Sequence, residues 1–137
     1  MNVRWDVTID TRKLDSLILR APELARNAIN AAAIAIQADA TENTKRVDTG
    51  AMKNSWMVQL CGGGQVANSV PSGAPLVSVP PGGANFAVVG SVVEYAYYWE
   101  VGHRGFGPEL MLSKAVEKNR PAFKRALSDA FRQYGIE

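Results

Sequence analysis

Apolar residues recur along this chain at two different spacings, which predict different elements. In residues 3–10 they alternate with polar residues, a period of two that indicates a strand. Leu14, Leu17 and Ile18 then share one helical face, which predicts a short helix. Residues 22–45 are rich in alanine, the residue with the highest helix propensity, and predict a long helix. Its expected packing face is a stripe of small residues, formed by Leu24, Ala28, Ala31, Ala35 and Ala38.

A second strong helical pattern lies near the other end of the chain, in residues 108–134. Apolar side chains recur there at helical period, opposite a charged face. Pro121 interrupts the pattern, because proline removes a backbone donor and disfavours helical dihedrals in the preceding residue. We therefore expect either a kink or two helices, with the break near Asn119 or Arg120. The predicted apolar stripe consists of Leu112, Val116, Phe123, Leu127, Phe131 and Tyr134.

Two strands are expected in the middle of the chain, on either side of a long loop. Residues 55–61 alternate in character and predict a strand with one apolar face, and the β-branched residues of 85–93 should pair with it. Residues 62–84 contain six glycines and four prolines, which exclude a regular helix and disfavour a central strand. We expect an extended loop or loose hairpin there that orders against a partner. Its candidate docking residues are Val70, Leu76, Val77 and Val79.

Length and composition narrow the class of protein. A chain of 137 residues indicates one domain. No window reaches the ~18 consecutive apolar residues of a membrane helix, and the N-terminus has no apolar stretch typical of a secretory signal. With Cys61 as the only cysteine and His103 as the only histidine, a structural zinc site is not expected. These features predict a protein made in a reducing cytoplasm, without a cofactor and without a membrane partner.

The charged residues are unevenly distributed. The net charge is only +2, and no Asp, Glu, Lys or Arg occurs between Lys53 and Glu94. We interpret the charged side of the last predicted helix first as a solvated face with i,i+4 pairs. The alternative is a surface near nucleic acid, where basic side chains neutralise phosphates without reading the base sequence. The candidate DNA-facing residues are Lys118, Lys124 and Arg125.

Two short patterns raise the question of catalysis. The tripeptide Asp48-Thr49-Gly50 matches the active-site loop of an aspartic protease, but such an enzyme needs two carboxylates that share a proton. The tripeptide also follows a long predicted helix, whereas a protease loop would lie between strands. Cys61 and His103 could form a nucleophile–base pair, but no glycine elbow or oxyanion-hole signature accompanies them. We therefore expect no enzymatic activity.

Aromatic residues cluster in a short helix expected at residues 95–101, which should stop at Gly102. Such side chains can stack on nucleic-acid bases, but they are more often core residues or interface anchors. We take this segment as a candidate subunit interface. Its residues are Tyr95, Tyr98, Trp99, Glu100, Gly102 and His103.

Taken in order, these segments resemble the minor tail-component family of tailed bacteriophages, whose members include tail-completion proteins of the head–tail neck. The resemblance covers about residues 22–130, and one departure is that His103 follows the second motif where the family commonly has threonine. The family pattern D-T-G-x-[LM]-[RK]-x-S is matched by Asp48, Thr49, Gly50, Met52, Lys53 and Ser55. The pattern Y-A-x-Y-x-E-x-G is matched by Tyr95, Ala96, Tyr98, Glu100 and Gly102. The proline-initiated last helix is matched by Pro108, Leu110 and Leu112.

This resemblance implies an α+β fold over a single domain, residues 1–137. In that fold, an antiparallel β-sheet is flanked by a long N-terminal helix and a Pro-interrupted C-terminal helix. It also implies a homo-oligomeric ring, expected to be sixfold, in the virion around the path of the DNA. The expected partners are head connector or head-closure proteins on one side and the tail terminator or tail tube on the other. The subunit would be made in the host bacterial cytoplasm.

Within the same resemblance, Asp48, Thr49 and Gly50 form a structural corner between the long helix and the sheet, where Gly50 permits a tight turn. A tail terminator or another minor tail subunit is the nearest alternative function. A nucleic-acid-binding protein that uses the last helix and the aromatic cluster is a more remote alternative.

Overall fold

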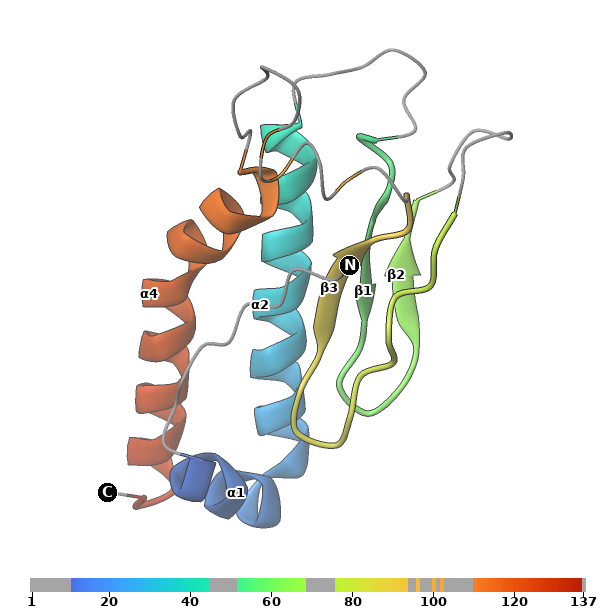
Figure 1. The fold of residues 1–137 in the computed structure, drawn as a ribbon. Coiled ribbons are helices and arrows are strands. Elements are labelled where there is room, and N and C mark those ends of the chain that lie inside the picture. Colours follow the sequence, from blue (N-terminus) through green and yellow to red (C-terminus); the bar gives the residue numbers. More distant parts are fainter. Residues whose placement is uncertain are drawn as a thin grey trace.

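The computed structural model describes residues 11–44, 52–68, 76–93, 96, 100, 102 and 110–136. The expected strand at 3–10 and most of the expected helix at 95–101 lie outside them. Figure 1 shows α2 between the sheet and α4, with α1 at one end of this stack. The fold class is α+β, as the resemblance implied. Its elements are α1 (Thr11–Arg20), α2 (Pro22–Asn43), β1 (Trp56–Gln59), β2 (Gln65–Ala67), β3 (Val88–Ser91) and α4 (Met111–Gln133).

Helix α2 is the central element, because it packs against both α4 and the sheet. Its bounds match the predicted long helix. The predicted packing face is correct only in part, since Leu24 and Ala28 pack against the core but Ala31 and Ala38 are exposed. Alanine favours a helix wherever it stands, so the spacing of alanines does not indicate which face is buried. The buried face instead consists of Ala25, Ile29, Ala33, Gln37 and Ala40.

Among the described residues, the sheet has three antiparallel strands in the order β2-β1-β3. Trp56 of β1 pairs with Ser91 of β3, so the predicted pairing of these two segments is confirmed. Strand β2 lies inside the segment 62–84, which is therefore not a loop throughout. The chain reverses before β2 through three consecutive glycines with positive φ, a conformation that favours glycine.

Strand β1 is buried on both faces, whereas the sequence predicted one apolar face. Trp56, Met57 and Val58 are all less than 9% exposed. Because side chains alternate along a strand, Trp56 and Val58 share the face that α2 covers, and Met57 points to the opposite face. The expectation of one apolar face failed because the covering layer comes from the segment 76–84, which has no regular pattern.

This Gly/Pro-rich segment lies on the sheet. Val79 is buried and packs over Gly90 of β3. Gly82 lies so close to β1 that an added Cβ would be 2.4 Å from the carbonyl oxygen of Leu60. Small residues therefore let the chain pass close over the sheet, and the segment closes its second face.

Helix α4 continues through Pro121, so the alternative of two separate helices is wrong. Figure 1 shows its N-terminal part inclined to the rest, in keeping with the expected kink. Packing on α2 from buried residues on both sides of the proline, such as Val116 and Leu127, holds the helix together. Tyr134, predicted on the apolar stripe, follows the end of the helix and is 37% exposed.

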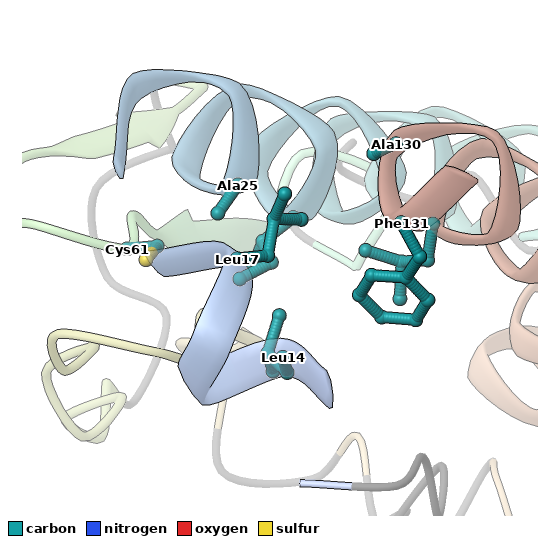
Figure 2. Packing of buried hydrophobic residues seen from close by; sticks show 8 residues of the cluster. Leu14, Leu17, Ala25, Cys61, Ala130 and Phe131 are labelled. Atoms are coloured by element: carbon teal, nitrogen blue, oxygen red, sulfur yellow. The ribbon is translucent and has the colours of Figure 1, made fainter. Parts of the chain in front are cut away.

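Two buried clusters fill the interior, and each contains residues of α4. Figure 2 shows the first, where Leu14 and Leu17 of α1 lie near Ala25 of α2 and Phe131 of α4. The second lies at the opposite end of α2. It consists of Ala40, Met52, Trp56, Ala96, Met111, Leu112, Ala115 and Val116.

Candidate functional site

The predicted turn at residues 48–50 lies outside the described residues, but the end of its motif is described. Met52 is 6% exposed and Ser55 is fully buried. The Ser55 hydroxyl donates to the Met52 carbonyl at 2.7 Å and accepts from the Ser91 hydroxyl at 2.7 Å. The last residue of the first motif therefore links the chain before β1 to the end of β3.

Glu100, in the second motif, caps the N-terminus of α4. One carboxylate oxygen accepts the Leu112 N–H at 2.9 Å. The other accepts the Ser113 N–H at 3.0 Å and the Ser113 hydroxyl at 2.8 Å. The residue is 3% exposed, and the free N–H groups and positive dipole of a helix N-terminus stabilise such an anion. Glu100 is thus bound within the chain, and the structure gives it a capping role in place of the expected interface role.

Of the other interface candidates, Tyr95, Tyr98, Trp99 and His103 lie outside the described residues. Gly102 is described and has φ of 89°, a left-handed conformation that favours glycine. The backbone conformation therefore explains why a glycine stands at this position of the motif.

The end of α2, the start of β1 and the start of α4 meet at one buried corner. The Trp56 indole N–H donates to the Thr44 hydroxyl at 3.0 Å, and this hydroxyl donates to the Ala40 carbonyl at 2.8 Å. The Asn43 amide donates to the Met111 carbonyl at 3.1 Å. We call this cluster the motif corner, because it contains buried residues of both motifs. Its members are Thr44, Met52, Ser55, Trp56, Ala96, Glu100 and Met111.

The candidate docking segment divides into an anchored part and a free part. Val70 lies outside the described residues. Val79 is buried against the chain's own sheet, so it is not available to a partner. The Val77 N–H donates to the Val92 carbonyl at 2.7 Å, which holds the backbone in place. The side chains of Leu76 and Val77 remain 63% and 43% exposed and are available for contact.

The candidate DNA-facing residues on α4 differ in their surroundings. Lys118 lies 3.1 Å from Asp39 of α2, so it links the two helices. Asn119 donates to the other oxygen of Asp39 at 2.7 Å. This hydrogen bond, assisted by Lys118, lowers the pKa of Asp39 below its usual value. Lys124 and Arg125 are exposed and have no ion-pair partner among the described residues.

Cys61 is a packed residue. It is 2% exposed, and its thiol donates to the Ala84 carbonyl at 3.3 Å. Burial raises the pKa of the Cys61 thiol, which keeps it protonated and weakly nucleophilic at neutral pH. Asn30 of α2 holds its backbone at both ends, accepting the Cys61 N–H at 2.8 Å and donating to the Cys61 carbonyl at 3.2 Å. Its suggested partner, His103, is outside the described residues.

Sequence reasoning missed two polar residues of α2. Gln37 is buried, and its amide donates to the Trp56 carbonyl at 2.9 Å and the Val66 carbonyl at 3.0 Å. Asn30 and Gln37 stand seven residues apart in an alanine-rich run, so they share a helical face. Two isolated amides on one face of an apolar helix were the signal that could have revealed this contact with the sheet.

Among the described residues, no helix has the length and apolar character needed to cross a membrane. That part of the chain also holds no group of three or more His, Cys, Asp or Glu side chains that could bind a metal ion. Comparisons with known proteins gave no match to a family model, a curated protein or a solved structure.

Proposed function

We propose that this protein is a structural subunit of the head–tail junction of a tailed bacteriophage. It forms a ring around the DNA path that completes the tail or joins it to the head connector. The observation that supports this proposal most directly is the motif corner, where residues of the two family-like motifs meet.

The motif corner explains why residues of these types stand at these positions. Ser55 of the first motif uses its hydroxyl to join two segments of the sheet. Glu100 of the second motif uses its carboxylate to start α4. Both side chains are buried and hydrogen-bonded within the chain, which is the expected arrangement for residues that define a scaffold. A motif made of scaffold residues fits a family of assembly proteins better than an enzyme family.

The distribution of charge fits a subunit that repeats one contact around an axis. Such a heterologous contact closes into a ring, and the centres of protein interfaces are depleted in charged residues. The stretch 54–93 contains no charged side chain and supplies all the strands among the described residues. Leu76, Val77 and Phe86 are exposed within it, so apolar contact surface is available on the subunit.

The basic residues fit transient proximity to DNA. Lys124 and Arg125 are exposed on α4, yet the net charge of the chain is only +2. Tight phosphate binding would oppose the passage of DNA through a ring, whereas a few exposed cations give only weak, salt-sensitive contact.

Electron microscopy of lysates from the parent phage, with this reading frame deleted, tests the proposal. We expect DNA-filled heads that accumulate apart from tails of normal length. Tails of abnormal length would indicate the alternative function of a tail terminator. Normal infectious particles would overturn the virion role.

A nucleic-acid-binding protein is the second candidate, favoured by the exposed Lys124 and Arg125. Gel shifts on duplex DNA over a range of salt concentrations separate the two functions. Tight binding that falls steeply with salt supports this second function, and weak binding at all but the lowest salt supports the first.

A further inference from the structure

Within the part of the chain that the structure describes, the outer edge of β2 presents backbone groups that no other strand pairs with. The Leu60 N–H donates to the Gly64 carbonyl at 2.8 Å, so Leu60 and Gly64 are a hydrogen-bonded pair of the antiparallel β1–β2 pairing. Because bonded pairs alternate in an antiparallel ladder, Val58 and Val66 form the next bonded pair. Gln65 and Ala67 therefore direct their N–H and C=O groups away from β1. Within the described residues, no strand pairs with this edge.

The edge of β2 is also apolar, and a side chain of α2 holds the strand in place. Gln37 donates to the Val66 carbonyl, so α2 fixes the strand from the buried side. Ile34 lies one turn earlier on the same side of α2 and is 42% exposed, and Val66 is 37% exposed. The edge thus combines free hydrogen-bonding groups with two exposed apolar side chains.

Natural proteins usually protect such edges with lysine, proline, a bulge or a very short strand. Strand β2 has three residues, but its sequence Gln-Val-Ala contains no lysine or proline and lies in a stretch without charge. An uncharged edge of this kind can add a strand from another chain.

The opposite edge of the same sheet is its natural complement. The Val92 N–H donates to the Ser55 carbonyl at 3.0 Å, so by the same alternation Val89 and Ser91 direct their backbone groups away from β1. Strand β3 is uncharged as well, and its outward residues have the same two-residue spacing as Gln65 and Ala67. The two edges can therefore meet without burying a charge.

We propose that the outer edge of β2 pairs with the outer edge of β3 of a second copy of this chain. This inference rests on the proposed ring and names the contact that closes it. Both strands run antiparallel to β1, so they run parallel to each other. Rotation about an axis along the strands preserves that direction, and the contact between copies is then a parallel pair that continues the sheet around the ring.

Charge substitutions at the two edges test this contact. Ala67 pairs with Met57, and Val88 pairs with Gln59. Met57 and Gln59 stand two residues apart on β1 and share one face of the sheet. Ala67 and Val88 therefore lie on that same face. Ala67→Lys and Val88→Glu should each weaken self-association about tenfold or more, since an unpaired charge would be desolvated at the contact. The double variant should restore association, because the lysine and the glutamate then lie on the same sheet face two residues apart along the strands, a diagonal spacing that long side chains can span. Sedimentation velocity and native mass spectrometry measure these effects.

Ala126→Lys is the matched control, because it places the same charge at an exposed position of α4, and it should leave association unchanged. Thermal unfolding checks that each variant is folded. Loss of association in Ala67→Lys without loss in Val88→Glu would indicate symmetric pairing of two β2 edges and would overturn the proposed contact. Association that persists in both single variants, or a wild-type chain that stays monomeric, would overturn it as well.

Electron microscopy of the deletion lysate distinguishes failure of the edge contact from failure of the proposed function. Separated heads and tails in the deletion lysate, together with charge variants that associate normally, would leave the head–tail role standing and remove only the edge contact. Normal particles in the deletion lysate would remove the role in the virion, whatever the association data show.

Discussion

At the scale of single residues, Glu100 shows what a buried carboxylate requires. Desolvation of a charge is costly unless hydrogen bonds replace the lost water. Glu100 accepts two backbone N–H groups and one hydroxyl at the start of α4, so three donors surround it. A carboxylate is an acceptor at both oxygens, whereas a glutamine amide would point its NH₂ group at one of these donors. The three donors at the start of α4 therefore favour a carboxylate side chain at position 100.

Replacing Glu100 with alanine should lower the free energy of unfolding by about 3 kcal/mol, because two buried N–H groups lose their acceptors. Urea unfolding measures the change. Glu117→Ala is the control, since Glu117 lies on the same helix, is 63% exposed and has only an i,i+3 pair with Arg120. It should change stability by less than about 0.5 kcal/mol. Equal losses in both variants would contradict the capping role.

Asp39 should make stability depend on pH. Its pKa in the folded state is lowered below 3.8, mainly by the hydrogen bond from Asn119, so the unfolded chain binds more protons in this window. The stabilisation is then fully present above about pH 5 and is lost as the pH falls through the folded pKa.

Asp39→Asn should therefore lower the free energy of unfolding by about 1 kcal/mol at pH 7, a modest figure because Lys118 is well exposed. The difference from wild type should shrink at pH 3. Asp129→Asn, at a side chain that is 76% exposed, should have an effect below about 0.5 kcal/mol at either pH. An Asp39→Asn effect that stays constant between pH 7 and pH 3 would contradict this reasoning.

At the scale of elements, the segment 76–84 acts as a covering layer of the sheet, and its glycines allow this. Gly82→Ala should lower the free energy of unfolding by about 1–3 kcal/mol, because the new Cβ meets the rigid backbone of Leu60. Gly90→Ala should be neutral or stabilising by up to about 1 kcal/mol, since its Cβ would make an ordinary contact 3.4 Å from Val79. Thermal unfolding of the pair measures both. A harmless Gly82→Ala would mean that the segment does not lie against the strand.

The elements differ in how far the sequence predicted them. Local spacing was sufficient for the helices Thr11–Arg20, Pro22–Asn43 and Met111–Gln133 and for the pairing of β1 with β3. It was insufficient for the buried face of α2, which depends on neighbours far away in the sequence. It allowed a loose hairpin within residues 62–84 but did not place β2 beside β1, although the two strands are close in the sequence. No local pattern indicates that a Gly/Pro-rich segment will cover a sheet.

The candidate site shows the same limit. Glu100 was assigned to an interface, because sequence spacing did not reveal its hydrogen-bond donors, which stand 12 and 13 residues further along the chain. Gln37 was missed because its partners belong to two different strands. Side-chain type and spacing reveal which residues matter, whereas the partners follow from the fold.

At the scale of the whole molecule, the proposed function makes the exposed Lys124 and Arg125 of α4 candidates for contact with DNA. If this face lies near the DNA path, weak duplex binding should fall with salt, and the Lys124→Gln/Arg125→Gln variant should reduce the log–log salt slope by about 2. Lys13→Gln/Lys53→Gln is the control, because it removes the same net charge from outside α4. Fluorescence anisotropy measures both slopes. An equal reduction in the control would indicate that only net charge matters and not this face.

The position of α4 has a consequence for biosynthesis. Both buried clusters need residues from it, such as Met111 in one and Phe131 in the other. Yet α4 leaves the ribosome after every other described element, so α1, α2 and the sheet emerge before either interior can close. Translation at roughly 5–20 residues per second leaves the apolar face of α2 uncovered for seconds on the nascent chain. Folding is therefore coupled to the synthesis of α4, because neither buried cluster is complete before this helix is made.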